Sequence, residues 1–104
     1  MKFEHDLPEN SAMPDLRQRI DALDRKLVTL IAERSRLIDE AAQIKLREGL
    51  PARIDSRVEE VAYNARQLAD EAGLNPELAD RLWRLMMEYF IAQEDRILKP
   101  ATDR

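Results

Sequence analysis

A run of apolar residues from Pro14 to about Leu46, spaced in alternating steps of four and three, constrains this chain most. Its members fall on one face of a helix: Leu16, Ile20, Leu23, Leu27, Leu30, Leu37, Ala41 and Ile44. This spacing is typical of a helix that packs along its length against other helices. About 33 residues form a rod of about 50 Å, whereas a compact chain of this length has a radius of gyration of about 13 Å. We therefore expect the rod to extend beyond its own chain and to pack against a partner.

The run is interrupted once, at Arg34, where the spacing predicts an apolar residue. A buried guanidinium without a counter-charge is very costly, so an anionic group should meet it. Lys45 lies on nearly the same face, about 16 Å further along the axis, so the two cations can bracket a small anionic molecule. Arg17 lies about 25 Å from Arg34. If Arg17 is functional it serves a second site, to which an antiparallel or crossed partner chain would bring it.

The composition indicates a single all-α domain. Charged residues make up 37% of the chain and hydrophobic residues 44%, with only two glycines. There is no cysteine, and the single histidine, His5, lies in a polar N-terminal stretch, so we expect no disulfide and no metal site. The net charge of −4 argues against nucleic-acid binding. Nothing resembles a signal peptide or a transmembrane run, so we expect a soluble, cytoplasmic protein with no membrane partner.

The first helix is predicted over residues 14–46, between a flexible tail at 1–13 and a linker at 47–53. Proline is favoured in the first helical turn, where Pro14 lies. Glycine and proline in the run Gly49-Leu50-Pro51 should end the helix.

Two further helices are predicted, over residues 53–72 and 76–98, followed by a C-terminal tail at 99–104. Gly73 is placed as a left-handed cap, and Asn75-Pro76 as an N-cap followed by proline. The expected seam of the second helix is Ile54, Val58, Val61, Ala65, Leu68 and Ala72. The third helix carries two neighbouring stripes: Leu82, Met86, Tyr89, Gln93 and Ile97, and Trp83, Met87, Phe90, Glu94 and Ile97. Glu94 thus lies on an otherwise large and apolar face.

Several cations and one carboxyl group on apolar walls are the candidates for chemistry. Arg17, Lys45 and Arg57 also have ordinary explanations as surface or helix-end residues. Glu94 either pairs with an arginine or stays protonated as a hydrogen-bond donor. The sequence shows no nucleophile–base pair, phosphate loop or metal cluster. The set suits a small, multiply anionic, partly apolar substrate and a reaction without a covalent step, in which the protein fixes a conformation and stabilises charge.

Five runs of residues carry a resemblance to a known family. They are Leu16-Arg17 with Ile20-Asp21 and Leu23-Asp24, then Leu30-Ile31-Ala32-Glu33-Arg34, Ile44-Lys45, Pro51 with Arg57, and Gly73-Leu74 with Leu82-Trp83. Over about residues 14–98 the chain resembles the all-helical chorismate mutase family. The resemblance implies a three-helix chain with a long first helix, forming an intertwined homodimer with two shared active sites. It also implies a cofactor-free Claisen rearrangement of chorismate, a small dianion, to prephenate in the shikimate pathway of aromatic amino acid biosynthesis.

The resemblance also implies roles for individual residues. Arg17 of the partner subunit, Arg34 and Arg57 match positions that hold the substrate carboxylates. Lys45 matches the residue that contacts the ether oxygen of the breaking bond. Glu94 matches a position that is commonly Gln, and it faces the same oxygen.

The chain departs from the family pattern at three positions. Ile54 replaces an Asp that reads the ring hydroxyl, Val58 replaces a nearby Glu, and Phe90 replaces a small Ser. These changes are similar to isochorismate-pyruvate lyases of the same fold, which make salicylate and pyruvate, so that activity is the alternative. A non-catalytic helical dimerisation module is a second alternative, although a purely structural seam would have an apolar residue at position 34.

Overall fold

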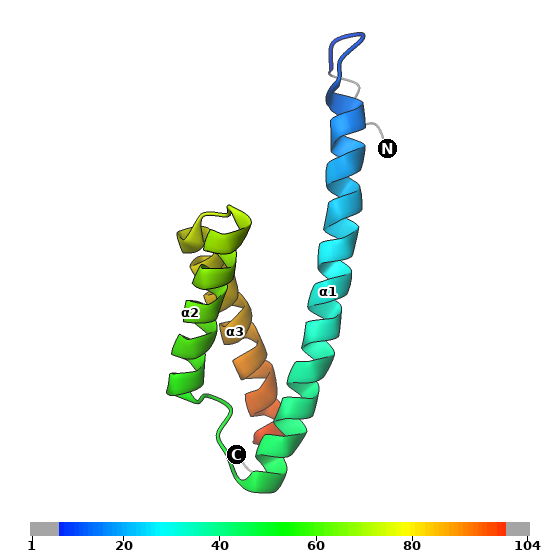
Figure 1. Cartoon of the computed structure of the whole chain (residues 1–104). Helices are drawn as coiled ribbons and strands as arrows, with labels where there is room; N and C mark the ends of the chain where they lie inside the picture. Colours follow the sequence, from blue (N-terminus) through cyan, green and yellow to red (C-terminus); the bar gives the residue numbers. More distant parts are fainter. Residues whose placement is uncertain (1–6, 100–104) are drawn as a thin grey trace. The chain divides into compact units, whose positions relative to one another are not determined.

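The computed structural model describes residues 7–99, which form three α-helices and no strand. These are α1 (Met13–Glu48), α2 (Asp55–Ala72) and α3 (Pro76–Leu98), shown in Figure 1. The all-α prediction is confirmed, and the bounds of the third helix are those predicted. Parts of the two predicted tails, residues 1–6 with His5 and residues 100–104, lie outside the described residues. No helix in the described range is both long and apolar enough to cross a membrane.

The chain divides into two compact units, Met1–Ser35 and Arg36–Arg104. In the first unit, a turn precedes α1: the Ser11 N–H donates to the Pro8 carbonyl at 3.3 Å. The Ser11 hydroxyl accepts from the Met13 N–H at 3.1 Å, which satisfies one of the free donors at the start of the helix. The helix therefore begins one residue earlier than Pro14 suggests.

The apolar face of α1 in the first unit is open to solvent. Between 40% and 60% of the surface of each of these residues is exposed: Leu16, Ile20, Leu23, Leu27 and Leu30. Exposed apolar residues that are contiguous along one helix face mark an interaction surface. This exposure is consistent with the sequence-based expectation that the rod packs against a partner.

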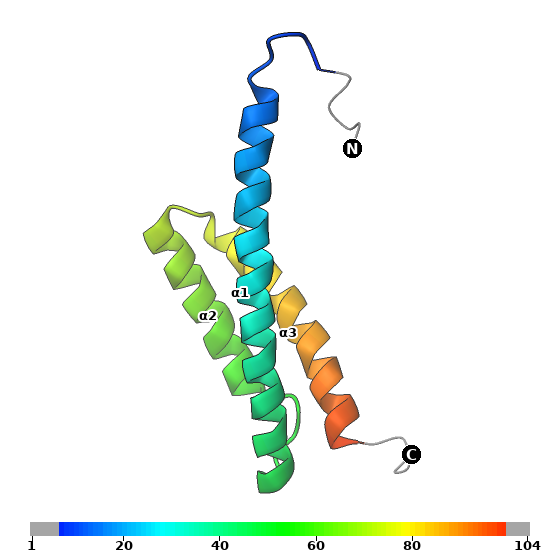
Figure 2. The same cartoon turned by 90° about the vertical axis from the view of Figure 1, so that its right-hand side faces the viewer.

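In the second unit, α2 and α3 form an antiparallel hairpin, as Figures 1 and 2 both show. The turn between them has the predicted local chemistry. Gly73 adopts a left-handed φ of 78°, and the Leu74 N–H donates back to the Ala69 carbonyl at 2.8 Å. The Asn75 side chain accepts from the Glu77 N–H at 2.9 Å, with Pro76 as the first helical residue.

Small residues make the contact between α2 and α3. Ala65, Ala69 and Ala79 form the buried cluster, and Trp83 packs against it. The predicted seam of α2 is partly wrong, because Leu68 is 63% exposed whereas Ala69, outside that seam, is buried. Alanines let the two helix axes come close, so the small face of α2 turns inward and the larger Leu68 turns outward.

On α3 the second predicted stripe faces the interior of the unit. Met87 and Glu94 are buried, and Phe90 is half-buried. In the first stripe, Leu82 and Tyr89 are 44% and 64% exposed. The buried stripe of α3 is therefore the one that contains the carboxyl group of Glu94.

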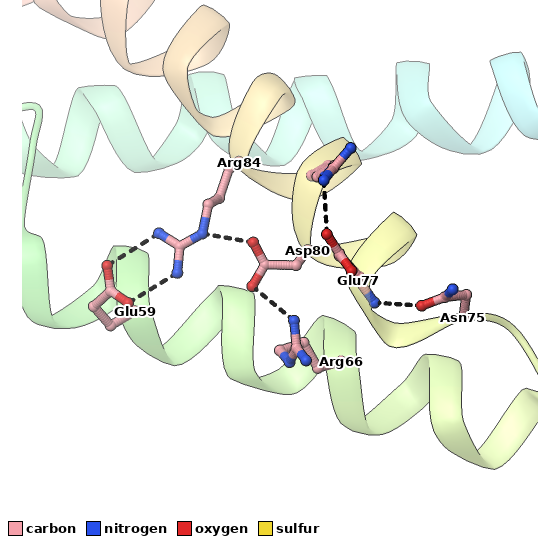
Figure 3. Close-up of polar contacts among 7 residues, drawn as sticks. Glu59, Arg66, Asn75, Glu77, Asp80 and Arg84 are labelled. Atoms are coloured by element: carbon pink, nitrogen blue, oxygen red, sulfur yellow. Dashed lines mark hydrogen bonds and ion pairs between the residues drawn. The ribbon is translucent and has the colours of Figure 1, made fainter.

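A charged clasp joins the two helices at their surface (Figure 3). The guanidinium of Arg84 on α3 donates to both carboxylate oxygens of Glu59 on α2, at 2.9 and 3.1 Å, and to Asp80 at 2.7 Å. Arg66 on α2 also donates to Asp80, at 3.4 Å. Hydrogen bonds from Arg84 hold the pKa values of Glu59 and Asp80 below their usual range. Because alanines interlock poorly along the helix axis, this directional clasp helps to set the register of α2 on α3.

Candidate active site

Lys45 lies in the last turn of α1, where the chain bends toward α2. The helix ends with Gly49 at a φ of 71°, and the Leu50 N–H donates to the Lys45 carbonyl at 2.9 Å. This bend brings the Ala52 carbonyl to 2.7 Å from Lys45 Nζ. Lys45 Nζ also donates to Glu94 Oε1, at 3.1 Å. An ammonium has three N–H donors, so one donor remains for a ligand.

Glu94 is the one buried charged side chain among the described residues, with 4% of its surface exposed. It comes from the apolar stripe of α3, and it forms an ion pair with Lys45. Its second oxygen, Oε2, is buried and accepts no hydrogen bond from any described residue. A buried polar atom without a partner is costly, so this atom favours a ligand or a water molecule at the site.

The start of α2 supplies three further candidates. Ile54 occupies the N-cap position, where its side chain cannot accept a hydrogen bond, and its carbonyl accepts from the N–H groups of Arg57 and Val58. Ile54 and Val58 are half-buried. Arg57 is exposed and donates to Glu60 at 2.8 Å. Because an exposed pair of this kind contributes little stability, a ligand carboxylate can take its place.

Phe90 lies on α3 one helical turn before Glu94 and is half-buried. Its ring meets that of Tyr89 edge to face, with ring centroids 5.3 Å apart and an interplanar angle of 84°. This arrangement is a favourable one for two aromatic rings. Phe90 makes this contact on the helix face that also carries the carboxyl group of Glu94.

Two of the eight candidates, Arg17 and Arg34, belong to the first unit, and the other six belong to the second. Both arginines are half-buried, and Nη1 of Arg34 is buried. Within the second unit, the hydrogen-bonded pair of candidates is Lys45 with Glu94. These two residues are separated by 49 positions in the chain, and the fold brings their charged groups together.

Sequence patterns did not single out three further groups. The carbonyl of Ala52 accepts a hydrogen bond from Lys45, and the side chain of Arg53, the next residue, forms an ion pair with Glu88 on α3. A backbone carbonyl has no signature in a sequence. Arg53 resembled an ordinary residue at the start of a helix, and Glu88 an ordinary residue on a solvated face.

Comparison with known proteins identifies the family to which this chain is similar. Residues 16–95 match the model of the chorismate mutase type II family. A T-protein of Haemophilus influenzae is 36% identical over 86 residues, which are 82% of this chain and 22% of that protein. A T-protein of Enterobacter agglomerans is 34% identical over 85 residues, with 81% of this chain and 23% of that protein covered. The chain thus spans less than a quarter of these two relatives.

One relative matches over nearly its whole length. The chorismate mutase of Methanocaldococcus jannaschii is 25% identical over 92 residues, which are 88% of this chain and 93% of that protein. The family match covers most of α1 and α3, the whole of α2 and all eight candidate positions from Arg17 to Glu94. The chain belongs to the chorismate mutase type II family.

Proposed function

We propose that this protein is a chorismate mutase that converts chorismate to prephenate without a cofactor. The observation that carries the proposal is the buried Lys45–Glu94 pair, set in the apolar stripe of α3 of a chain that belongs to this family. The pair leaves one ammonium donor and one carboxyl oxygen for a ligand. A cation held in this way is suited to stabilise negative charge as it develops on an oxygen atom.

The reaction is a rearrangement within one molecule. The carbon–oxygen bond of the enol ether breaks while a carbon–carbon bond forms between the enolpyruvyl methylene and the ring. The ether oxygen becomes a ketone oxygen and carries partial negative charge in the transition state. We assign the remaining N–H of Lys45 to that oxygen. No proton is transferred, so the protein accelerates the reaction by holding the folded conformer and by stabilising the developing charge.

Three arginines are assigned to the two carboxylates of the substrate: Arg34, Arg57 and Arg17 of the partner subunit. Guanidinium groups bind carboxylates through paired hydrogen bonds, which fix orientation as well as charge. Ile54, Val58 and Phe90 are assigned to the apolar wall around the ring. The half-buried state of Ile54 and Val58 supports this assignment.

That apolar wall favours isochorismate-pyruvate lyase as the second candidate function, because Ile54 and Val58 offer no hydrogen bond to a ring hydroxyl. Incubating the purified protein with chorismate and, separately, with isochorismate tests both. Loss of chorismate absorbance with formation of prephenate supports the mutase. Salicylate fluorescence from isochorismate supports the lyase. Silence with both substrates would reject both enzymes in favour of a non-catalytic dimerisation module.

The same proposal includes a homodimer with shared sites. The support for it is the solvent-exposed apolar face of α1, whose four- and three-residue spacing suits a second long helix. A second copy of this chain carries the same face, and a two-fold arrangement would cover both at once. It would also let Arg17 of each chain serve the site of the other.

Refolding Arg17→Ala and Lys45→Ala chains together, in equal amounts, is expected to restore activity that neither variant has alone. Half of the dimers are then mixed, and one of the two sites in each mixed dimer has both residues intact. We therefore expect about a quarter of the wild-type activity. Size-exclusion chromatography of differently tagged chains confirms the exchange. Mixed dimers without activity would show that both residues act from one chain, and activity of Arg17→Ala alone would show that Arg17 has no role.

Glu94→Gln is expected to raise kcat/KM at neutral pH by about tenfold. An ionised Glu94 offers only lone pairs to the ether oxygen, and they repel the developing charge. The amide keeps an oxygen for Lys45 and adds an N–H donor. Glu94→Ala is the matched control, because it removes the charge without supplying a donor, and it should stay below Glu94→Gln. Equal kcat/KM values for these two variants would show that the donor has no role.

A further inference from the structure

We propose that Arg53 and Glu88 are positioning residues, whose ion pair holds the segment between α1 and α2 so that Lys45 points its remaining donor at the substrate. The proposal rests on the proposed function in one respect, namely that this N–H group of Lys45 donates to the ether oxygen of the substrate. The placement of Lys45 itself is a property of the fold and can be tested without any substrate.

The segment between α1 and α2 has few anchors of its own. It leaves α1 through Gly49 in a left-handed conformation and contains Pro51, which has no N–H to donate. Its one hydrogen bond to the side chain of Lys45 is made by the Ala52 carbonyl, at 2.7 Å. Ala52 is 6% exposed, so this carbonyl is in a protected environment, where its hydrogen bond to an ammonium is strong.

Arg53 directly follows Ala52 and ties the segment to α3. Its guanidinium donates to Glu88 Oε1, across 35 positions of the chain. The hydrogen bond from Arg53 lowers the pKa of Glu88, and the same bond raises the pKa of Arg53, so both groups stay ionised at neutral pH. The two side chains are 43% and 58% exposed, so the pair ties the residue next to the Ala52 carbonyl to α3 from the surface of the unit.

Both acceptors of Lys45 therefore depend on α3. Glu94 belongs to that helix, and Ala52 is held to it through the Arg53–Glu88 pair. With two of its three N–H groups directed in this way, tetrahedral geometry fixes the direction of the third. Loss of the pair frees the segment to move, and the donor of Lys45 then samples several directions before the reaction. Preorganised donors are the ones that accelerate a reaction.

We would test this proposal by measuring kcat and KM for Arg53→Gln, Glu88→Gln and the double variant. We expect each single variant to lower kcat by about fivefold, with KM changed less than about twofold, because the donor acts on the transition state. The double variant should lose about fivefold, not twenty-five-fold, since either change already breaks the pair. Arg53→Lys keeps the charge and should recover most of the loss. Arg81→Gln is the matched control, because it breaks an exposed ion pair with Glu77 on the same helix, and it should leave kcat unchanged.

The ammonium of Lys45 supplies a readout that needs no substrate. Hydrogen bonds to Ala52 and Glu94 slow the exchange of its protons with water, so its side-chain ¹⁵N–¹H signal should be visible in the wild type. The signal is identified by its absence from Lys45→Met. We expect it to broaden in Arg53→Gln and in Glu88→Gln but not in Arg81→Gln. A sharp signal in all variants, or multiplicative losses in kcat, would overturn the proposal. A wild-type protein inactive on chorismate would instead refute the proposed function and leave the signal as the test of positioning.

Discussion

Lys45→Met is expected to lower kcat/KM by about 10²- to 10³-fold and to destabilise the folded protein. The loss of activity follows from the proposed role of the ammonium, which is to stabilise charge that exists only in the transition state. The loss of stability has a separate cause in Glu94, whose side chain is 6% exposed and would lose the partner that it has in Lys45. Breaking a buried ion pair in this way costs about 3–5 kcal/mol, and we expect the lower end because the side chain of Lys45 is 18% exposed.

The double variant Lys45→Met/Glu94→Gln separates the two effects. Removing the charge of Glu94 should restore most of the free energy of unfolding, because no buried charge is then left without a partner. Activity should stay far below that of the wild type, since the neutral amide at position 94 does not replace the cationic donor of Lys45. We would measure urea denaturation and kcat/KM for the wild type, both single variants and the double variant. These measurements separate the effect on stability from the effect on activity. A double variant as unstable as Lys45→Met would show that the stability loss comes from the lysine stem and not from the charge of Glu94.

Arg34→Ala is expected to reduce kcat/KM through a loss of about 2–5 kcal/mol in transition-state binding, while the chain stays folded. Arg34 interrupts an otherwise apolar run, so alanine suits the helix at least as well. Its Nη1 atom is buried, and a guanidinium in that setting binds a carboxylate strongly. The variant should therefore lose activity without losing helix content or the proposed dimer.

Arg36→Ala is the matched control for Arg34→Ala. It removes the same charge two residues away, from an exposed position of the same helix. Its kcat/KM should stay within about twofold of the wild type, because an exposed charge outside the site contributes little. Circular dichroism and size-exclusion chromatography check that both variants are folded and equally associated. Near-normal turnover by Arg34→Ala would remove this residue from the site.

Local chemistry made the helices and their ends predictable from the sequence. The positions of Gly73, Asn75 and Pro76 each favour one backbone conformation or one hydrogen bond, and these preferences act within a few residues. The structure has the expected turn at that place. The apolar stripe of α3 was predictable for a similar reason, because the helical period determines which residues share a face.

Which face of α2 is buried depended on the neighbouring helix. The apolar pattern alone does not distinguish Leu68 from Ala65. In the structure α2 packs against α3 through its alanines, and Leu68 is exposed. Burial of one face over another depends on the distance between two helix axes. That distance is a property of the pair and not of either sequence segment.

Three helices, the caps at Gly73 and Asn75, and the charged residues on apolar faces, Arg34, Lys45 and Glu94 among them, could be predicted from the sequence. The hydrogen bonds of Lys45 with Glu94 and Ala52, and the ion pair of Arg53 with Glu88, could be found only in the folded chain. The two sets of features differ in the distance along the chain over which they are determined. Helix and turn preferences are set by atoms a few positions apart, whereas these contacts need the bend at Gly49 and the register of α2 on α3 to be established first.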